Sequence, residues 1–364
     1  MFDVKTNKAI CVLPWVHEYK QSNAKSAPCC RSHRPFSSNE SVTKLRQSML
    51  NGIREDICKT CYDSEDATGT SDRIFETVDW IKKYGTPNID NPKMQFADIR
   101  FDPTCNLKCK TCNPGESTLW AKEKGVSVQI DAENEIFFNN IKKQDLKKIY
   151  LAGGEPTYIK NYLSFLRELY KQNPECEVVV NSNLKKLPDA WKIIISKFKN
   201  ITIVCSCDAI DILGEYVRYP IQWNEFTKNV DFVSKNANHL QFNLVASNLT
   251  AHKIYETCLW MKNYSNNIDI TVLDKPTHFS EKAVPYDVRN IYLENLQKCL
   301  KFPINVFMAS QYRTRIQYLI KKYKAENYDK NLHMQLKAEI IEQDSHRKLQ
   351  IKDVDPFLYD WIFT

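Results

Sequence analysis

Short apolar runs alternate with amphipathic stretches between residues 95 and 275. Six runs have the length and the Val-, Ile- and Phe-rich composition of β-strands, and stretches such as 159–173 and 189–200 have the apolar spacing of helices. Strands that alternate with helices form parallel βα units. We therefore predict an α/β fold, as an open doubly wound sheet or as a barrel with fewer than the eight units of a closed one. The predicted strands are 96–102, 147–153, 176–183, 201–208, 240–247 and 268–274.

Polar residues recur on one face of most of these strands. Successive strand residues point to opposite faces, so Asp98 and Arg100 share a face, as do Gln241 and Asn243. A filled barrel, or a sheet covered on both sides, would be apolar at these positions. The pattern favours a splayed, partial (β/α)6 barrel with a ligand inside. By the same alternation, Asn183, Ser206 and Asp269 face the lumen.

The chain on either side of this alternation has a different pattern. Residues 1–80 combine a hairpin-like stretch, 10–30, with a predicted helix, 41–50, and five cysteines. A region this small has difficulty forming a core, and we predict that metal holds it together. Residues 280–364 are mostly helix-like and charged and end in the apolar sequence FLYDWIFT. We thus predict three parts: a cysteine-rich module (1–80), a barrel (95–275) and a C-terminal helical extension (280–364).

Composition narrows the class of protein. The chain has 364 residues, of which 43% are hydrophobic and 26% charged, as in a globular protein. The net charge of +7 is spread over many lysines and acids, and does not indicate nucleic-acid binding. No apolar run approaches the ~18 residues of a membrane span, and the first residues do not form a secretory signal. We expect a cytoplasmic protein, whose 13 cysteines are metal ligands or buried thiols rather than disulfides.

Cys105, Cys109 and Cys112 follow the first predicted strand with the spacing C-x3-C-x2-C. In (β/α) folds, chemistry gathers in loops after the carboxyl ends of strands. Structural zinc prefers four protein ligands; no further cysteine or histidine follows closely, so zinc would need a distant fourth ligand. An iron–sulfur cube offers an iron to each of four thiolates. Three cysteines would leave one iron open to a small molecule.

The tetrapeptide GGEP, residues 153–156, follows the second predicted strand. Glycines let a backbone approach a ligand closely, and the Glu155 carboxylate accepts hydrogen bonds from an amino group. Together, CNLKCKTC (105–112) and GGEP resemble the signature of the radical S-adenosylmethionine (SAM) superfamily. The resemblance covers roughly residues 95–275.

The resemblance implies that Cys105, Cys109 and Cys112 bind a [4Fe–4S] cluster whose open iron is chelated by SAM. One electron, from a reductant such as flavodoxin or ferredoxin, would split SAM into methionine and a 5′-deoxyadenosyl radical that abstracts a substrate hydrogen. The resemblance also places further residues at SAM: Gly153, Gly154 and Glu155 at its amino group, Ser206 and Arg218 at its carboxylate or ribose, and Asn183 as an additional contact.

Such a radical reacts with any nearby C–H bond, so the lumen must exclude solvent and position the substrate with a few polar groups. The candidates for that role are the lumen-facing residues Asp98, Arg100, Gln241, Asn243 and Asp269. Alternatively, these side chains form internal salt bridges across the barrel floor.

The N-terminal cysteines form a second candidate metal site. Cys58 and Cys61 have the C-x2-C spacing of zinc and iron–sulfur sites, and Cys11 with Cys29 or its neighbour Cys30 would complete the set. Spacing alone does not separate zinc from a cluster. The sequence CVLPW…APCC…LRQSMLNG…ICKTC resembles the Twitch or SPASM auxiliary-cluster module of radical SAM enzymes, although that module usually follows the barrel and carries a turn glycine absent here. The resemblance implies one auxiliary iron–sulfur cluster on Cys11, Cys29, Cys58 and Cys61.

Radical SAM enzymes with such modules are similar in acting on peptides or proteins, or on alcohols of small molecules. We expect a peptide or protein substrate, which the C-terminal extension and its aromatic end could cover or guide. The alternative for that end is a docking strand or core helix of the protein itself. The alternatives for the function are a dehydrogenase of a small-molecule alcohol and a non-catalytic iron–sulfur or zinc protein that binds nucleic acid or a partner. Epimerisation would require a thiol in the lumen, for which Cys258 is the candidate.

Overall fold

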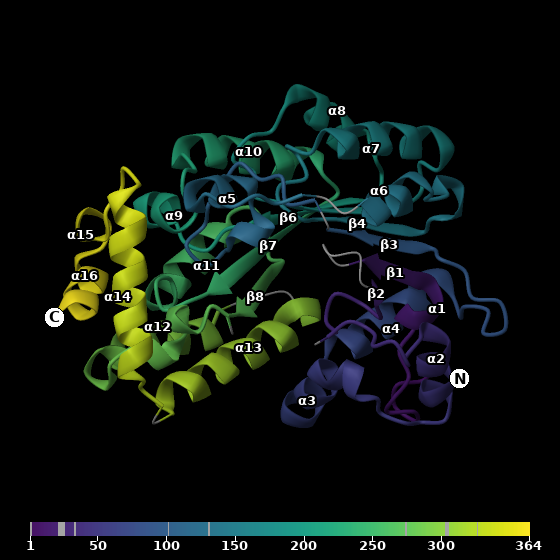
Figure 1. The fold of residues 1–364 in the computed structure, drawn as a ribbon, viewed down its shortest axis with the longest axis horizontal. Helices are drawn as coiled ribbons and strands as arrows, with labels where there is room; N and C mark the ends of the chain where they lie inside the picture. The colour runs from purple at the N-terminus through teal and green to yellow at the C-terminus, as the bar shows by residue number, and fades with distance from the viewer. Residues whose placement is uncertain are drawn as a thin grey trace. The chain divides into compact units, whose positions relative to one another are not determined.

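The computed structural model describes residues 2–20, 26–32, 34–100, 102–129, 132–273, 275–302, 306–325 and 327–364. It consists of two compact units, and Figure 1 traces the chain through them. The first unit comprises Met1–Pro103, Val128–Val180 and Ser196–Ile201. The second comprises Thr104–Ser127, Asn181–Ile195 and Thr202–Thr364.

The first unit contains parallel strands that follow one another in chain order. β1 (His17–Lys20) pairs with β3 (Phe96–Ile99), β3 with β4 (Lys148–Leu151), and β4 with the first residues of β5 (Glu177–Ser182). The short strand β2 (Ser26–Ala27) runs antiparallel to β1 and closes a hairpin with it. The hairpin was predicted, but the parallel pairing of β1 with β3 was not, because a pairing between segments so far apart leaves no local pattern.

Some helices of the first unit begin or end at residues with capping chemistry. The Ser41 hydroxyl accepts from Lys44 N at the start of α2, and Ser71 does the same for Ile74 N at the start of α4. Gly69 ends α3 in the left-handed conformation that glycine adopts most easily. The helices of this unit are α1 (Leu13–Val16), α2 (Val42–Leu50), α3 (Lys59–Thr68), α4 (Asp72–Tyr84), α6 (Ala132–Asn139) and α7 (Lys160–Gln172).

The second unit contains the parallel strands β6 (Ile201–Ser206), β7 (His239–Ala246) and β8 (Ile268–Val272). β7 shows the predicted alternation most clearly. Its residues Leu240, Phe242, Leu244 and Ala246 are buried, whereas Gln241 and Asn243 are half-buried. A strand with one apolar and one polar face covers a core on one side only.

Each of the six predicted strands contains an observed strand, so the α/β class with successive parallel strands is confirmed. The two helices predicted at 159–173 and 189–200 are α7 and α8 (Asp189–Lys197). The remaining helices of the second unit are α5 (Thr118–Lys124), α9 (Asp211–Val217), α10 (Trp223–Asn236), α11 (Ile254–Lys262), α12 (Arg289–Leu300), α13 (Val306–Lys324), α14 (Lys330–Ser345), α15 (Ile351–Val354) and α16 (Pro356–Phe363). No helix in the described ranges is long and apolar enough to cross a membrane.

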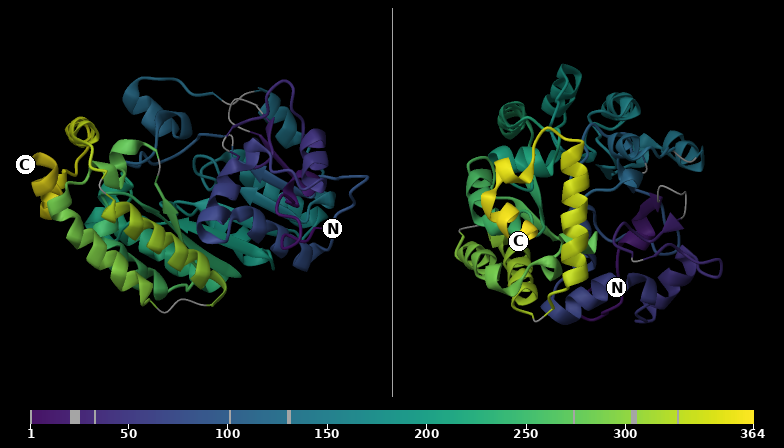
Figure 2. Two further views of the ribbon diagram at one scale, coloured as in Figure 1. Left: turned by 90° about the horizontal axis from the view of Figure 1, so that it is seen from below. Right: turned by 60° about the vertical axis from the view of Figure 1, so that its left-hand side comes forward.

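The chain ends in a helix that packs on its own unit. The sequence FLYDWIFT forms most of α16, in which Leu358, Trp361 and Ile362 are buried. α16 lies beside α14 and α15, which Figure 2 shows in yellow. Lys337 Nζ of α14 donates to Phe363 O at 3.0 Å. This aromatic end is thus a core helix of its own unit, which is the alternative to a cover or guide for the substrate.

Candidate functional site

The three-cysteine loop is anchored through its backbone to the end of α9. Lys108 N donates to Tyr219 O at 2.7 Å, and Lys110 N donates to Val217 O at 2.8 Å. These two N–H groups lie on either side of Cys109. The loop therefore has a defined path although its described residues, 102–113, form no helix or strand.

α5 supplies a second set of anchors. Trp120 Nε1 donates to Cys109 O at 2.8 Å, and Cys105 N donates to Thr118 Oγ1 at 3.1 Å. The Ser117 hydroxyl, which caps α5, donates to Leu107 O at 2.5 Å. The start of α5 thus fixes the loop near two of its three cysteines.

The three cysteines of the loop form no disulfide and are half-buried. Burial raises the pKa of Cys109, and burial together with the nearby Cys109 sulfur raises the pKa of Cys112 to about 12. Thiols this close disfavour one another's ionisation unless a cation lies between them. The donor set therefore suits a positively charged centre that binds thiolates.

No group of three or more His, Cys, Asp or Glu side chains within the described ranges is arranged to hold a single metal ion. A cube binds each thiolate through a different iron. Its cysteine ligands therefore lie further apart than those of one zinc ion. Three cysteines on one loop would bind three of the four irons and leave the fourth open.

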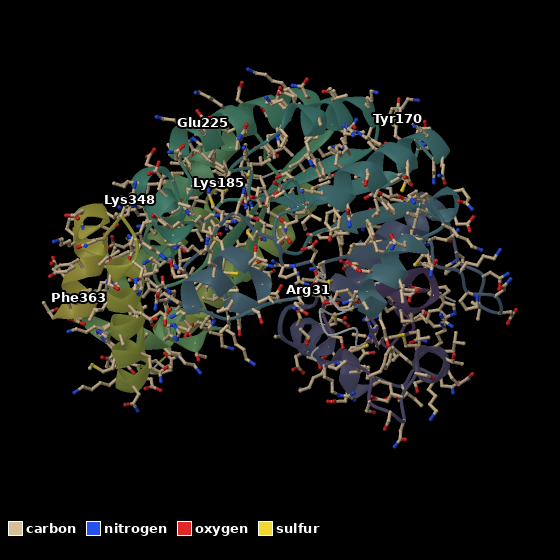
Figure 3. All side chains as sticks on the ribbon, turned by 45° about the horizontal axis from the view of Figure 1, so that its top comes forward. Arg31, Tyr170, Lys185, Glu225, Lys348 and Phe363 are labelled. Carbon is tan, nitrogen blue, oxygen red and sulfur yellow. The ribbon has the colours of Figure 1, made fainter. Side chains whose placement is uncertain are left out.

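The segment after β5 contacts the cysteine loop within the second unit. Asn183 Nδ2 donates to Asn106 Oδ1 at 2.9 Å, and Lys185 Nζ donates to Asn106 O at 3.0 Å. Lys185 is labelled in Figure 3. Burial lowers the pKa of Lys185, while the Cys105 sulfur acts in the opposite direction. Asn183, predicted as a SAM contact, thus lies against the loop, and the structure adds Asn106 and Lys185 to the site.

Arg218 lies near Cys109 and is held by a carboxylate. Its Nη1 pairs with Asp208 Oδ2 at 2.8 Å, and Asp208 Oδ1 accepts from Val245 N at 2.9 Å. Burial alone would lower the pKa of Arg218, but Cys109 and Asp208 raise it. Arg218 Nε is buried and has no hydrogen-bond partner in the part of the chain that the structure describes. An orphaned guanidinium N–H beside a cysteine loop is a donor suited to an anionic group such as a carboxylate.

Ser206, at the end of β6, makes a longer hydrogen bond than Asn183 does. Its hydroxyl donates to Asn181 Oδ1 at 3.4 Å. The predicted SAM contacts Asn183, Ser206 and Arg218 all belong to the second unit, as do the three cysteines.

Gly153, Gly154 and Glu155 belong to the first unit. Gly153 has φ +103°, and a Cβ there would lie 2.6 Å from Asp102 O. Gly154 N donates to the same oxygen at 2.7 Å. The glycines therefore allow two backbone segments to touch, which is a structural requirement independent of any ligand.

The Glu155 carboxylate is buried and caps its own turn. Its Oε1 accepts from Thr157 N at 3.0 Å and from Thr157 Oγ1 at 2.6 Å. Binding an amino group through Oε1 would mean sharing that oxygen with Thr157.

Asp98 and Arg100, predicted as substrate contacts or as an internal salt bridge, bond to each other. Arg100 Nε and Nη2 donate to the two Asp98 oxygens at 2.6 and 2.7 Å. Burial would raise the pKa of Asp98, but Arg100 and His17 outweigh it and hold the pKa at about 2. The guanidinium also lies 4.9 Å from the centroid of the Tyr150 ring. Their geometry corresponds to the salt-bridge alternative.

The other substrate candidates lie on β7 and β8. Asn243 Oδ1 accepts from Thr271 Oγ1 at 3.0 Å, and Asp269 pairs with Arg315 of α13 at 2.8 Å. Gln241 is half-buried on the same face as Asn243. Asp269 is therefore also part of an ion pair, whereas Gln241 and Asn243 keep a polar, partly accessible face.

Four N-terminal cysteines from three segments come together in the first unit. Cys11 precedes α1, Cys29 follows β2, and Cys58 and Cys61 lie at the start of α3. Burial raises the pKa of each, to about 12 for Cys58 and about 11 for Cys61, and neighbouring thiols contribute for Cys11, Cys29 and Cys58. Cys30 is exposed, and the charged groups that act on it are Arg100, Asp98, Arg31 and Asp72. Of the four clustered cysteines, the adjacent Cys29 has Cys30 as a neighbour.

A buried arginine holds this cysteine cluster in place. Arg73 of α4 pairs with Glu65 at 2.6 Å and donates to Ile10 O, next to Cys11. Val12 N, on the other side of Cys11, donates to Thr77 Oγ1 at 3.1 Å. Cys11 is thus fixed from both sides by α4.

Cys258 does not lie where epimerisation would need it. It is fully buried in α11, and Tyr312 of α13 donates to its sulfur at 3.6 Å. Cys299 of α12 is a further neighbour of the Cys258 thiol. The expectation of a lumen thiol at this position is wrong, because the helix period turns Cys258 toward α12 and α13.

The comparisons with known proteins bear on the cysteine loop. Residues 99–216 match the family described as "4Fe-4S single cluster domain". The chain is 27% identical over 154 residues to the GTP 3′,8-cyclase of Campylobacter lari, and 23% identical over 138 residues to that of a Sulfurovum species. These two matches cover 42% and 34% of this chain, which spans 45% and 41% of the length of those relatives.

Solved structures match at low similarity. The chain is 16% identical to the Streptococcus suis protein SuiB bound to its precursor peptide SuiA, with a TM-score of 0.41, covering 75% of this chain and 56% of that one. The matched family region contains Cys105, Cys109 and Cys112 together with the segments that carry Asn183 and Ser206. Arg218 lies just beyond its end.

Proposed function

We propose that the protein is a radical SAM enzyme whose active site is built on the Cys105–Cys112 loop. The observation that carries this proposal is the convergence on one loop of three cysteines that form no disulfide, the Asn183 amide and the Arg218 guanidinium. When bound, a [4Fe–4S] cluster supplies the electron that cleaves SAM reductively, and the resulting radical removes a substrate hydrogen.

The chain's own residues have distinct roles in this proposal. Cys105, Cys109 and Cys112 hold the cluster. Arg218, oriented by Asp208, offers its Nε–H to the SAM carboxylate. Asn183 and Ser206 add hydrogen bonds from the ends of β5 and β6. Gly153, Gly154 and Glu155 contact the SAM amino group, as the resemblance implies.

A second cluster on Cys11, Cys29, Cys58 and Cys61 is also part of the proposal. Burial raises the pKa of all four thiols, and neighbouring thiols add to this for Cys11, Cys29 and Cys58. Such a set suits a positively charged polynuclear centre that binds thiolates. The exposure of Cys30 and the charged groups around it favour Cys29 as the fourth ligand. With four thiolates, such a cluster would relay electrons. A one-electron reductant such as flavodoxin or ferredoxin would supply them.

For the substrate we propose a peptide or protein. Gln241 and Asn243 each present both a donor and an acceptor on the half-buried face of β7, which matches the alternating donors and acceptors of a peptide backbone. A small molecule is the second candidate, favoured by the curated relatives, which are named for a reaction of GTP. Adding peptide or GTP to the SAM-cleavage reaction, and measuring which one accelerates it, separates the two classes.

Spectroscopy of the anaerobic protein tests the proposed site. After reconstitution with iron and sulfide and reduction by dithionite, we expect an electron paramagnetic resonance signal that changes when SAM is added. Replacing Cys105, Cys109 and Cys112 together by alanine should abolish the SAM-sensitive signal, whereas Cys176→Ala, at a buried packing position, should leave it unchanged. Zinc in the loop, with no SAM-sensitive signal, would refute the proposal.

A further inference from the structure

The two lysines that flank Cys109 both meet buried acids. Lys110 Nζ bonds to Asp344 Oδ1 at 2.7 Å, and the Lys110 side chain is completely buried. Asp344 lies at the end of α14, 234 positions further along the chain. A residue of the cysteine loop is therefore held by the C-terminal extension.

Asp344 is fully engaged within the second unit. Its Oδ1 also accepts from the Tyr216 hydroxyl at 2.9 Å, and its Oδ2 accepts from Ile351 N at 2.8 Å. The Lys110 ammonium lies 4.0 Å from the centroid of the Tyr216 ring. With both oxygens occupied, the carboxylate is an internal partner of the loop rather than a substrate contact.

Arg347 connects the same extension to the other flank of Cys109. Its Nη2 pairs with Glu123 Oε1 at 3.0 Å, and Glu123 pairs through its second oxygen with Lys108. The Arg347 guanidinium lies 4.9 Å from the Trp120 ring and 5.7 Å from the Tyr219 ring. Trp120 and Tyr219 are the residues that bind Cys109 O and Lys108 N, so Arg347 packs directly on the anchors of the loop.

The buried pairs Lys110–Asp344 and Glu123–Arg347 are better explained by the arrangement that they impose on the loop than by a contribution to folding stability. A buried ion pair often contributes no more to folding than a well-packed apolar pair, but it defines one arrangement of its partners. α14 is also held by contacts far from the loop, such as His333 Nε2 with Ile362 O at 3.1 Å and Lys337 Nζ with Phe363 O. The helix therefore does not need Asp344 or Arg347 to remain docked on α16.

We propose that Asp344 and Arg347 form a clamp that fixes the cysteine loop and positions Cys109 and Cys112 for their cluster. The part of this inference that concerns the cluster rests on the proposed function, whereas the fixing of the loop does not. Both are positioning residues, because they act through Lys110, Trp120 and Tyr219. Figure 1 shows α14, from which the clamp extends.

The first test uses the protein without metal. Alkylation of Cys109 and Cys112 by iodoacetamide is followed by mass spectrometry in wild type, Asp344→Asn and Glu342→Gln. Glu342 lies on the same helix but is 51% exposed and pairs with Lys124, so it is the matched control. Loosening the loop should accelerate alkylation about tenfold in Asp344→Asn and leave Glu342→Gln at the wild-type rate.

A second variant covers the case in which Asp344→Asn fails to fold. Arg347→Met keeps a long side chain between Trp120 and Tyr219, and Glu123 retains its pair with Lys108, so no buried acid loses every partner. It should also accelerate alkylation. Rates equal to wild type in every folded variant would overturn the clamp.

The second test uses the reconstituted protein. Asp344→Asn should lose iron to a chelator faster than Glu342→Gln, and the resonance signal of its reduced cluster should change, because Lys110 then carries an unpaired charge. Unchanged iron release and an unchanged signal would show that the clamp does not position the cluster ligands. If wild type itself takes up no iron, the proposed function fails, and the alkylation rates still decide whether the clamp exists.

Discussion

Asn183 donates through Nδ2 to Asn106 Oδ1 at 2.9 Å, so the segment after β5 and the cysteine loop share a hydrogen bond. Asn183 Oδ1 also accepts from Lys185 N at 2.9 Å, which fixes the orientation of the amide. Asn106 lies directly after Cys105 in the chain. A polar residue predicted from strand alternation is therefore in contact with the loop predicted to bind the cluster.

Removing this amide should weaken SAM binding moderately. A neutral hydrogen bond contributes about 0.5–1.5 kcal/mol, so Asn183→Ala should raise the Kd for SAM roughly 2- to 10-fold. Equilibrium binding to the anaerobic, reconstituted protein measures the change. Asn229→Ala is the control, because Asn229 makes a comparable bond to Leu184 O at 2.9 Å without touching the loop. Equal affinities in both variants would remove Asn183 from the site.

Cys29 and Cys30 should differ sharply in their effect on iron content. Cys29 lies among the other N-terminal cysteines, whereas Cys30 is exposed near Arg100. Cys29→Ser should lose roughly half of the iron of a two-cluster protein, and Cys30→Ser should retain it. Iron and sulfide analysis after anaerobic reconstitution measures both. Iron loss in Cys30→Ser but not in Cys29→Ser would identify Cys30, and not Cys29, as the ligand.

The Asp98–Arg100 pair predicts a pH dependence of stability. Asp98 has a pKa of about 2 in the folded protein, whereas an aspartate in an unfolded chain has a pKa near 3.9. The depressed pKa contributes stability that is fully present above about pH 4 and is lost as the pH falls toward 2, by about 2 kcal/mol. Urea unfolding at several pH values measures it. The free-energy gap between wild type and Asp98→Asn should shrink over that range.

The control for this prediction is Asp189→Asn, since the Asp189 side chain is 90% exposed. The difference in free energy of unfolding between Asp189→Asn and wild type should stay constant with pH. A constant gap for Asp98→Asn as well would mean that the salt bridge does not hold Asp98 ionised.

Gly153→Ala should destabilise the protein through a backbone clash. A Cβ at Gly153 would lie 2.6 Å from Asp102 O, whereas one at Gly69, which also has positive φ, would meet nothing within 4 Å. Gly69→Ala should therefore cost only the left-handed conformation, about 1 kcal/mol. Gly153→Ala should cost about 1–3 kcal/mol more. Urea denaturation curves compare them, and similar costs would contradict the close approach of the two segments.

The strands could be predicted from sequence because their signal is local. Alternation along 240–247 defines a polar and an apolar face, and β7 has both. The pairing of β1 with β3 could not be predicted, because His17–Lys20 has no apolar period and its partner lies far away in the chain.

The candidate site likewise combines residues that a local sequence signal identifies with residues that only the fold brings together. The spacing of Cys105, Cys109 and Cys112 is a local signal, and so is the position of Asn183 at a strand end. Lys110 and Asp344 are two ordinary charged residues in the sequence, and only the fold brings them together. For Asp98 and Arg100 the sequence left substrate binding and a salt bridge equally open, since strand alternation gives the face of a side chain but not its partner.

The most direct test of the central claim is the formation of 5′-deoxyadenosine by the oxygen-free protein. Reconstituted wild type, reduced with dithionite in the presence of SAM, should release 5′-deoxyadenosine and methionine, detected by liquid chromatography and mass spectrometry. The triple alanine variant of Cys105, Cys109 and Cys112 should release none. A wild-type protein that carries a cluster in this loop and yet forms no 5′-deoxyadenosine would contradict the account and favour a non-catalytic binding role.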